Sequence, residues 1–140
     1  MCGIAGYIST QSTSEIPALD VTRRMINQMR PRGPDAEGLW AGEGVVLGHR
    51  RLAILDLDAR ATQPMTSIDG RYTIVFNGEI YNFRELRSEL EAEGVAFRTT
   101  SDTEVLLALF ARDGERMLPR LRGMFAFGIW DAQSGELFLA

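Results

Sequence analysis

The chain has little of what an extracellular, membrane-bound or nucleic-acid-binding protein needs. Its 140 residues include one cysteine, which excludes an internal disulfide bond and favours a soluble protein of the reducing cytoplasm. No apolar run approaches the roughly 20 residues of a membrane-spanning helix, and the N-terminus lacks the basic segment and apolar core of a signal peptide. The net charge is −4 and the pI about 5.0, which argues against nucleic-acid binding.

Residues that bind metals are scarce as well. His49 is the only histidine and Cys2 the only cysteine, so the clusters of these residues that hold zinc do not occur. The carboxylates of Asp56, Asp58 and Asp69 are scattered in or near expected loops, without the spacing of metal ligands. We therefore expect no metal site in this chain.

What is present suits one globular domain. Hydrophobic residues make up 45% of the chain, enough for a single core. Apolar patterning predicts strands at Cys2–Ile8, Gly44–Leu47, Leu52–Leu57, Tyr72–Phe76, Met124–Trp130 and from Glu136, and helices at Leu19–Arg30, from Asn82 to Gly94 and from Ser101 to Gly114. This order lacks a regular alternation of strand and helix, so it favours a layered α+β fold with antiparallel sheets.

Local signals define several element ends. Asn82 and Ser101 stand where N-cap residues are expected, each with a glutamate three residues later. Asn77-Gly78 is a common turn dipeptide and is expected to end the strand before it. In the first helix, Val21, Met25 and Met29 have the spacing of a buried face.

The chain stops inside an apolar run, Leu137–Ala140. A strand that ended there would leave unpaired backbone and exposed apolar surface. We expect the sequence to be a fragment of a longer protein.

Cys2 is the residue whose position most clearly suggests a reactive role. Removal of Met1 would leave a thiol and a free α-amino group on one residue. An α-amine titrates at about 7.7–8.0, so part of its population can take a proton at neutral pH. Such a residue carries a nucleophile together with its own general base. A lone cysteine is more often a small buried hydrophobic residue, so position alone does not decide between the two.

The terminal amine also bears on His49. A sole histidine invites a role as general base, but an amine in that role makes a histidine unnecessary. We therefore expect His49 to be structural.

Several short motifs occur in a characteristic order. They are Cys2-Gly3-Ile4-Ala5-Gly6, Arg32-Gly33-Pro34-Asp35, Gly48-His49-Arg50-Arg51-Leu52-Ala53-Ile54, Gln63-Pro64-Met65, Asn77-Gly78-Glu79-Ile80-Tyr81-Asn82, Asp102-Thr103-Glu104-Val105 and Gly123-Met124-Phe125-Ala126-Phe127. Each has an ordinary explanation as a turn, a cap or a surface charge. The ordered set resembles the glutaminase domain of glutamine-hydrolysing asparagine synthetases, a class II glutamine amidotransferase of the N-terminal-nucleophile hydrolase type.

The resemblance implies a fold and a reaction. The fold would be a four-layer αββα sandwich of antiparallel sheets, incomplete at its C-terminus, with residues 1–140 forming part of the amidotransferase domain. The reaction would be hydrolysis of L-glutamine to glutamate and ammonia through a cysteinyl thioester. The glutaminase half would need no cofactor. The missing synthetase domain of the same protein would use the ammonia, with ATP and Mg²⁺, to make asparagine from aspartate, and the resemblance leaves a homodimer open.

The resemblance also assigns roles to residues. Cys2 would be the nucleophile, and the side chain of Asn77 and the backbone N–H of Gly78 would form the oxyanion hole. Arg51 would hold the α-carboxylate of glutamine, and Asp102, with Glu79 nearby, its α-ammonium group. The backbone of Leu52, Ala53, Ile54 and Leu55 would line the pocket.

Arg50 and Arg51 compete for one of these roles. Adjacent residues of a strand point to opposite faces, so we expect only one of them to reach the pocket. In the family, the binding arginine directly precedes the apolar run, which selects Arg51. The sequence departs from the family at Pro31, where a histidine is usual, and at Arg60-Ala61-Thr62, where a glycine commonly precedes Gln63.

Three alternatives stay open. The chain could be another class II amidotransferase with a different acceptor, such as glucosamine-6-phosphate synthase or amidophosphoribosyltransferase. It could be a catalytically silent glutamine-binding module in which Met1 is retained. It could also be a fragment that does not fold alone.

Overall fold

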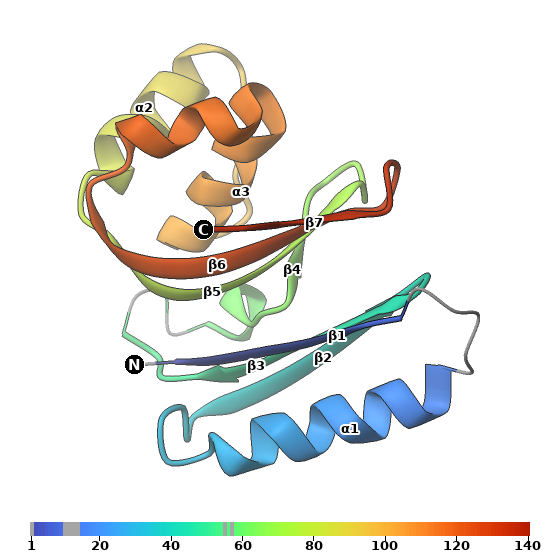
Figure 1. Cartoon of the computed structure of the whole chain (residues 1–140). Coiled ribbons are helices and arrows are strands. Elements are labelled where there is room, and N and C mark those ends of the chain that lie inside the picture. Colours follow the sequence, from blue (N-terminus) through green and yellow to red (C-terminus); the bar gives the residue numbers. More distant parts are fainter. Residues whose placement is uncertain (1, 10–14, 55, 57) are drawn as a thin grey trace.

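The computed structural model describes residues 2–9, 15–54, 56 and 58–140. They form four layers, with two sheets face to face between layers of helix (Figure 1). Helix α1 (Glu15–Gln28) covers one sheet, and α2 (Phe83–Ala92) and α3 (Asp102–Asp113) cover the other. The predicted α+β class and the four layers are confirmed. No helix in the described part of the chain has both the length and the apolar character to cross a membrane.

Every pair of neighbouring strands is antiparallel. The first sheet has the order β1-β3-β2, and the second has the order β4-β5-β6-β7. The strands are β1 (Gly3–Ile8), β2 (Ala36–Gly42), β3 (Val45–Arg51), β4 (Met65–Thr66), β5 (Tyr72–Ile80), β6 (Gly123–Asp131) and β7 (Glu136–Leu139), and two short 3₁₀ helices are η1 (Ala59–Ala61) and η2 (Gly114–Arg120).

Alternation along β5 sends its side chains to two different cores. Ile74 and Phe76 belong to the larger core beneath α2 and α3. Val75 belongs to a smaller core, which includes Leu47 of β3. Since side chains two residues apart lie on one face of a strand, Asn77 faces the same way as Val75. It therefore points toward the sheet that begins at the N-terminus.

The first helix differs from its prediction in its extent and in its buried face. It starts at Glu15 rather than Leu19, and Met25 is 42% exposed, whereas Thr22 and Ile26 are fully buried. The reason lies in β3. An added Cβ at Gly48 would come within 2.7 Å of Ile26 Cγ2 and 2.9 Å of Thr22 Cγ2, so the missing side chain admits these two residues.

The strand predictions were wrong in several places. Strands β2 and β4 were not predicted, and β3 runs to Arg51 rather than ending at Leu47. Strand β5 does not end at Asn77-Gly78 but continues to Ile80, because β6 pairs with it as far as Ile80↔Gly123. The described residues 52–54 and 56 form no strand. The backbone N–H groups of Leu52 and Ala53 donate to side chains, the Sγ of Cys2 and the carboxylate of Asp35, rather than to a neighbouring strand.

One of the two predicted N-caps is confirmed. The Ser101 hydroxyl accepts a hydrogen bond from the N–H of Glu104, while the Glu104 carboxylate reaches back to the N–H of Thr99. Asn82 precedes α2 but makes no side-chain cap. Its amide instead bridges the chain at the end of η2, donating to the Arg120 carbonyl and accepting from the Arg122 N–H.

Candidate active site

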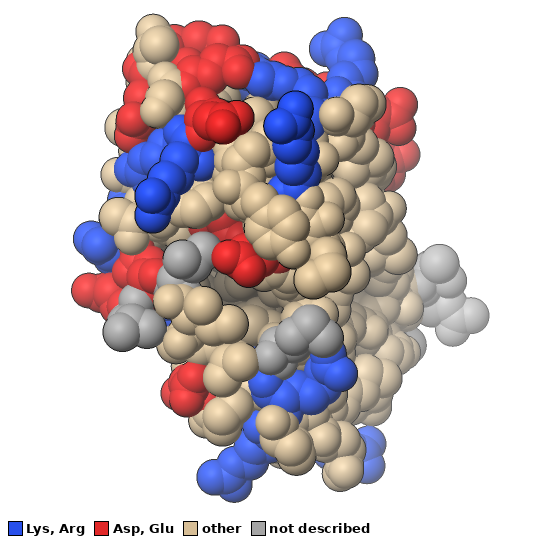
Figure 2. Space-filling model, turned by 90° about the vertical axis from the view of Figure 1, so that its left-hand side faces the viewer, with Lys and Arg blue, Asp and Glu red and all other residues tan. Residues whose placement is uncertain are grey.

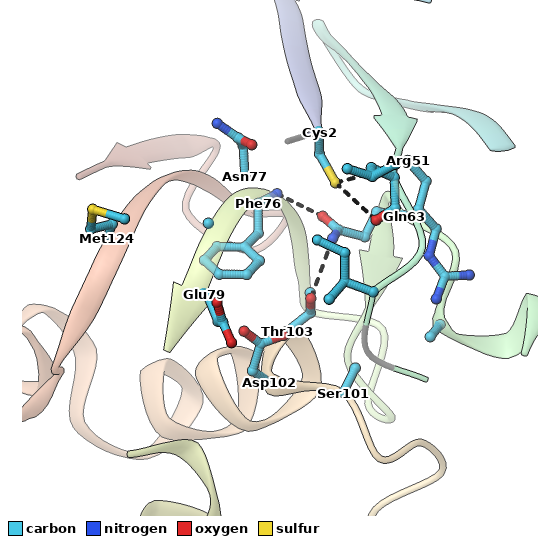
Figure 3. Close-up of a pocket in the computed structure, with 14 residues that line it drawn as sticks. Cys2, Arg51, Gln63, Phe76, Asn77, Glu79, Ser101, Asp102, Thr103 and Met124 are labelled. Atoms are coloured by element: carbon cyan, nitrogen blue, oxygen red, sulfur yellow. Dashed lines mark hydrogen bonds between the residues drawn. The ribbon is translucent and has the colours of Figure 1, made fainter. Parts of the chain in front are cut away.

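A cavity of about 190 Å³ opens where the start of β1, the end of β5 and the N-terminus of α3 converge. Its lining consists of Cys2, Arg51, Leu52, Ile54, Ala61, Gln63, Phe76, Asn77, Gly78, Glu79, Ser101, Asp102, Thr103 and Met124 (Figure 3). On the face of the molecule that carries the N-terminus, acidic atoms stand at the edge of a hollow (Figure 2).

Cys2 is held at the wall of this cavity by backbone contacts. Its Sγ accepts a hydrogen bond from the N–H of Leu52 at 3.4 Å and lies 3.8 Å from the Leu52 carbonyl oxygen. The Nε of Arg32 donates to the Cys2 carbonyl at 3.2 Å. The thiol is partly exposed. The only cysteine thus lines the cavity, and its backbone carbonyl is held by the hydrogen bond from Arg32.

The turn that contains Arg32 supports the same wall. At Gly33 an added Cβ would lie 2.5 Å from the carbonyl of Arg50, so only glycine allows this approach to β3. Two residues on, the Asp35 carboxylate accepts from the N–H of Ala53 at 2.8 Å. The motif Arg32-Gly33-Pro34-Asp35 therefore joins β1, β3 and the segment after β3.

The two adjacent arginines diverge, as expected. Arg51 lines the cavity and is 6% exposed, and its guanidinium donates to the carbonyl oxygens of Asp58, at 2.9 Å, and Asp56. Arg50 turns the other way, to the carbonyl of Ile26 at 3.2 Å and the carboxylate of Glu37 at 3.0 Å. The prediction that Arg51 alone of the pair reaches the cavity is confirmed, whereas its role toward a ligand stays a prediction.

Asn77 and Gly78 lie side by side on β5 at the cavity. The Oδ1 of Asn77 is buried and has no hydrogen-bond partner among the described residues. A buried amide left unpaired in a cavity is available to a ligand, and the assignment of its oxygen and nitrogen can be interchanged by a half-turn of the amide. At Gly78 an added Cβ would lie 2.3 Å from the Met124 carbonyl of β6, so β5 and β6 tolerate no side chain there.

The far end of the cavity is acidic. Asp102, in the first turn of α3, is 5% exposed and accepts from the N–H of Ile80 at 3.0 Å. Burial raises the pKa of this carboxyl, and the nearby charge of Glu79 raises it further. A cation placed here would favour the ionised form of Asp102.

Not every predicted lining residue is in place. The side chains or backbone of Cys2, Arg51, Leu52, Ile54, Asn77, Gly78, Glu79 and Asp102 line the cavity, as predicted. Ala53 does not, because its N–H is turned to Asp35. Leu55 lies outside the described residues. Six further lining residues were not predicted from the sequence, although Gln63, Thr103 and Met124 belong to the motifs and Ser101 was expected as a cap. The six are Ala61, Gln63, Phe76, Ser101, Thr103 and Met124.

His49 is fully buried and is not part of the cavity lining. Its Nε2 hydrogen-bonds with the Phe76 carbonyl at 3.1 Å, and its Nδ1 has no partner among the described residues. Burial lowers its pKa to about 4, and the charge of Arg51 acts in the same direction. A neutral imidazole at this position fits the structural role expected of it. No group of three or more His, Cys, Asp or Glu side chains in the described ranges could hold a metal ion.

The lowered pKa of His49 makes stability depend on pH. Between its ordinary pKa of 6.5 and the folded value of about 4, the unfolded chain binds more protons, so stability falls as pH falls through this window. We expect the free energy of unfolding to be about 2 kcal/mol lower at pH 5 than at pH 7 from this group. Urea unfolding at both pH values measures it.

The matched variant is His49→Gln, which keeps an N–H donor for Phe76 but does not titrate. In this variant, the free energy of unfolding should differ much less between pH 7 and pH 5 than it does in the wild type. The raised pKa of Asp102 acts with the opposite sign, so it cannot supply the fall. An equal fall in His49→Gln would contradict the assignment.

Comparison with known proteins agrees with this geometry. The whole chain, residues 1–140, matches the glutamine amidotransferase domain family. It is 44% identical over 139 residues to the glutamine-hydrolyzing asparagine synthetase 1 of Bacillus subtilis (strain 168), covering 99% of this chain and 22% of that protein. It is 38% identical over 133 residues to the glutamine-hydrolyzing asparagine synthetase B of Escherichia coli (strain K12), covering 95% of this chain and 24% of that protein.

Among solved structures, the chain resembles the glutamine phosphoribosylpyrophosphate amidotransferase of B. subtilis in complex with ADP and GMP. The TM-score is 0.72 at 25% identity, covering 94% of this chain and 35% of that one. The chain belongs to the glutamine amidotransferase domain family. It spans less than a quarter of the length of each of these two asparagine synthetases.

Proposed function

We propose that this chain hydrolyses L-glutamine to L-glutamate and ammonia, with Cys2 as nucleophile once Met1 has been removed. One observation carries the proposal. The only cysteine, at the head of the chain, faces a cavity that also contains an arginine, an unpaired asparagine amide and a buried carboxylate, namely Arg51, Asn77 and Asp102. Family membership gives the reaction class.

The first half of the reaction breaks the amide. The α-amine of Cys2, through a water by the family pattern, takes the thiol proton, and the sulfur attacks the carboxamide carbon of glutamine. The oxyanion that forms would be stabilised by the side-chain N–H of Asn77 and the backbone N–H of Gly78. The protonated amine then gives its proton to the leaving nitrogen. Ammonia departs and a γ-glutamyl thioester remains on Cys2.

The second half restores the enzyme. The α-amine removes a proton from a water molecule, which attacks the thioester carbonyl through a second oxyanion in the same position. The carbon–sulfur bond breaks, and the sulfur takes the proton back. Glutamate leaves, so the sum is one glutamine and one water converted to one glutamate and one ammonia.

Recognition of the amino-acid head group would use the two ends of the cavity. The planar guanidinium of Arg51 suits a bidentate contact with the α-carboxylate. Asp102, with Glu79 beside it, suits the α-ammonium group, which would favour the ionised carboxylate. A substrate that lacks either group should therefore bind poorly.

The wider role is also a proposal. Because the asparagine synthetase relatives are several times longer, we propose that residues 1–140 are part of an amidotransferase domain followed by a synthetase domain. That domain would bind ATP and Mg²⁺ and use the ammonia to convert aspartate to asparagine. A cytoplasmic location remains a prediction from the single cysteine, and a homodimer stays open.

A second candidate is an amidotransferase with another ammonia acceptor. The structural likeness to the phosphoribosylpyrophosphate amidotransferase favours it. The higher identity to asparagine synthetases over nearly the whole chain favours the first candidate. Assaying the full-length protein for asparagine formation from aspartate, ATP and glutamine separates the two.

The test of the proposed function is covalent labelling of the full-length protein. We expect 6-diazo-5-oxo-L-norleucine, an electrophilic glutamine analogue, to form one adduct on Cys2, and glutamine to protect against it. Peptide mass mapping reads the adduct and the loss of Met1 together. Residues 1–140 contain no lysine, so the only amine within them is the N-terminal one. An amine-reactive reagent therefore labels that terminus alone and shows which residue carries it. A retained Met1 with no adduct would instead support the silent binding module.

A further inference from the structure

Gln63 occupies a place in the structure that the proposed reaction does not yet use. Its side chain lines the cavity and is almost fully buried, with 6% of the residue exposed. Both ends of its amide are engaged. Its Oε1 accepts from the N–H of Phe76 at 2.6 Å, and its Nε2 donates to the Thr103 hydroxyl at 3.3 Å (Figure 3).

The hydrogen bond from Phe76 to the Gln63 side chain takes the place of a backbone hydrogen bond between β4 and β5. Strand β4 is only two residues long, and it pairs with β5 as Met65↔Ile74 and Thr66↔Thr73. Continuing that register by two residues would set position 63 opposite Phe76. The main chain is not part of the sheet there, because β4 begins only at Met65. The Gln63 amide takes up the Phe76 N–H that an extended β4 would have received.

The main chain of Gln63 has a third contact. An added Cβ at Gly38 of β2 would lie 2.0 Å from the Gln63 carbonyl oxygen. This residue therefore packs on the first sheet through its backbone, and its side chain bonds to β5 and to the first turn of α3.

We propose that Gln63 is a positioning residue, which sets the oxyanion-binding segment of β5 at its working distance from the nucleophile. It acts through Phe76, the residue directly before Asn77, and through Thr103, the neighbour of Asp102. Because its amide oxygen and one of its amide N–H groups are engaged by Phe76 and Thr103, we assign it to holding the site together rather than to binding the substrate. The inference rests on the proposed function, since it assigns a purpose to the same cavity.

Two variants of Gln63 in the full-length protein begin the test. Gln63→Met has a similar shape but no hydrogen-bonding group, so Phe76 and Thr103 lose their partner and kcat for glutamine hydrolysis should fall about tenfold, a part of what an oxyanion donor supplies. Gln63→Glu keeps an acceptor for Phe76 and can accept from the Thr103 hydroxyl, so kcat should return to within about threefold of the wild type.

The deciding measurement is a double-mutant cycle with Asn77→Ala. If Gln63 works chiefly by placing the side-chain donor of Asn77, the residue next to Phe76, losing Gln63 should matter little once Asn77 is gone. The double variant Gln63→Met/Asn77→Ala should then keep kcat within about threefold of Asn77→Ala alone. Thr73→Val is the control, because it breaks a partly buried hydrogen bond to Thr66 at the same β4–β5 edge. It should lower the melting temperature and leave kcat unchanged.

The outcomes are distinguishable. Multiplicative losses in the double variant, or a fall in kcat for Thr73→Val equal to that for Gln63→Met, would overturn the positioning role and leave the proposed function intact. A wild-type protein without glutaminase activity would overturn both. If Gln63→Met does not fold, Thr103→Val replaces it, because this change removes the hydroxyl that accepts from the Gln63 amide. The double variant Thr103→Val/Asn77→Ala should then also keep kcat close to that of Asn77→Ala alone.

Discussion

Replacing Cys2 with alanine is expected to lower glutamine hydrolysis at least 10⁴-fold, to the background of the assay. The thiol is the only group of its kind in these 140 residues, and its loss removes the covalent route while leaving the cavity intact. Removing the nucleophile of a hydrolase typically costs several orders of magnitude in kcat. Glutamate release at saturating glutamine measures the loss.

The fold should survive this change. The Cys2 side chain is only partly buried and its polar contacts are with the backbone of Leu52, so the melting temperature should shift little. Cys2→Ser is the companion variant, because it keeps the α-amine and a hydroxyl but replaces the thiol with a much weaker acid. In the full-length protein, synthesis from added ammonia should continue in both variants. Turnover within tenfold of the wild type in Cys2→Ala would mean that the nucleophile lies elsewhere.

Replacing Arg51 with alanine is expected to raise the KM for glutamine on the order of 10²–10³-fold, with a smaller effect on kcat. A bidentate contact between a guanidinium and a carboxylate contributes about 3–4 kcal/mol when each hydrogen bond is charge-assisted. That contact is equally present in the ground state and the transition state, so its loss falls mainly on KM. Steady-state kinetics over a wide range of glutamine concentration separates the two constants.

The neighbouring arginine supplies a matched control. Arg50 carries the same charge one residue away but contacts Ile26, Asn27 and Glu37. Arg50→Ala should therefore lower the melting temperature and leave KM within about twofold. Arg51→Lys keeps a point charge but loses the planar fork, so its KM should fall between those of wild type and Arg51→Ala. Equal KM values for the two alanine variants would contradict the assignment of Arg51.

The sequence predicted those features that depend on periodicity and local capping. Alternation predicted that only one of Arg50 and Arg51 would reach the pocket, and the family pattern selected Arg51. In the structure, one face of β3 meets α1 and the other meets the cavity. Ser101 was predicted as a cap because the distance of three residues to Glu104 is set by helix geometry alone. The motifs of the family then indicated which strand ends would meet.

What the sequence could not predict depends on partners far along the chain. Asn77-Gly78 has the local preference of a turn, but pairing with Phe125 and Ala126 keeps it extended. Met25 and Ile26 are both apolar, and it is Ile26 that packs where Gly48 lacks a side chain. Gln63 shows the same limit, because a glutamine gives no sign that its side chain will complete a sheet.

The cavity has two walls of different construction. On one side, Asn77 and Gly78 belong to a strand that is in register with β6 at nine successive positions, and Gly78 lies against the Met124 carbonyl. On the other side, residues 52–54 follow no regular structure, and Ile54 is 69% exposed. Efforts to redesign this domain for bulkier amides should therefore randomise the irregular wall, since the strand wall leaves no room for new side chains.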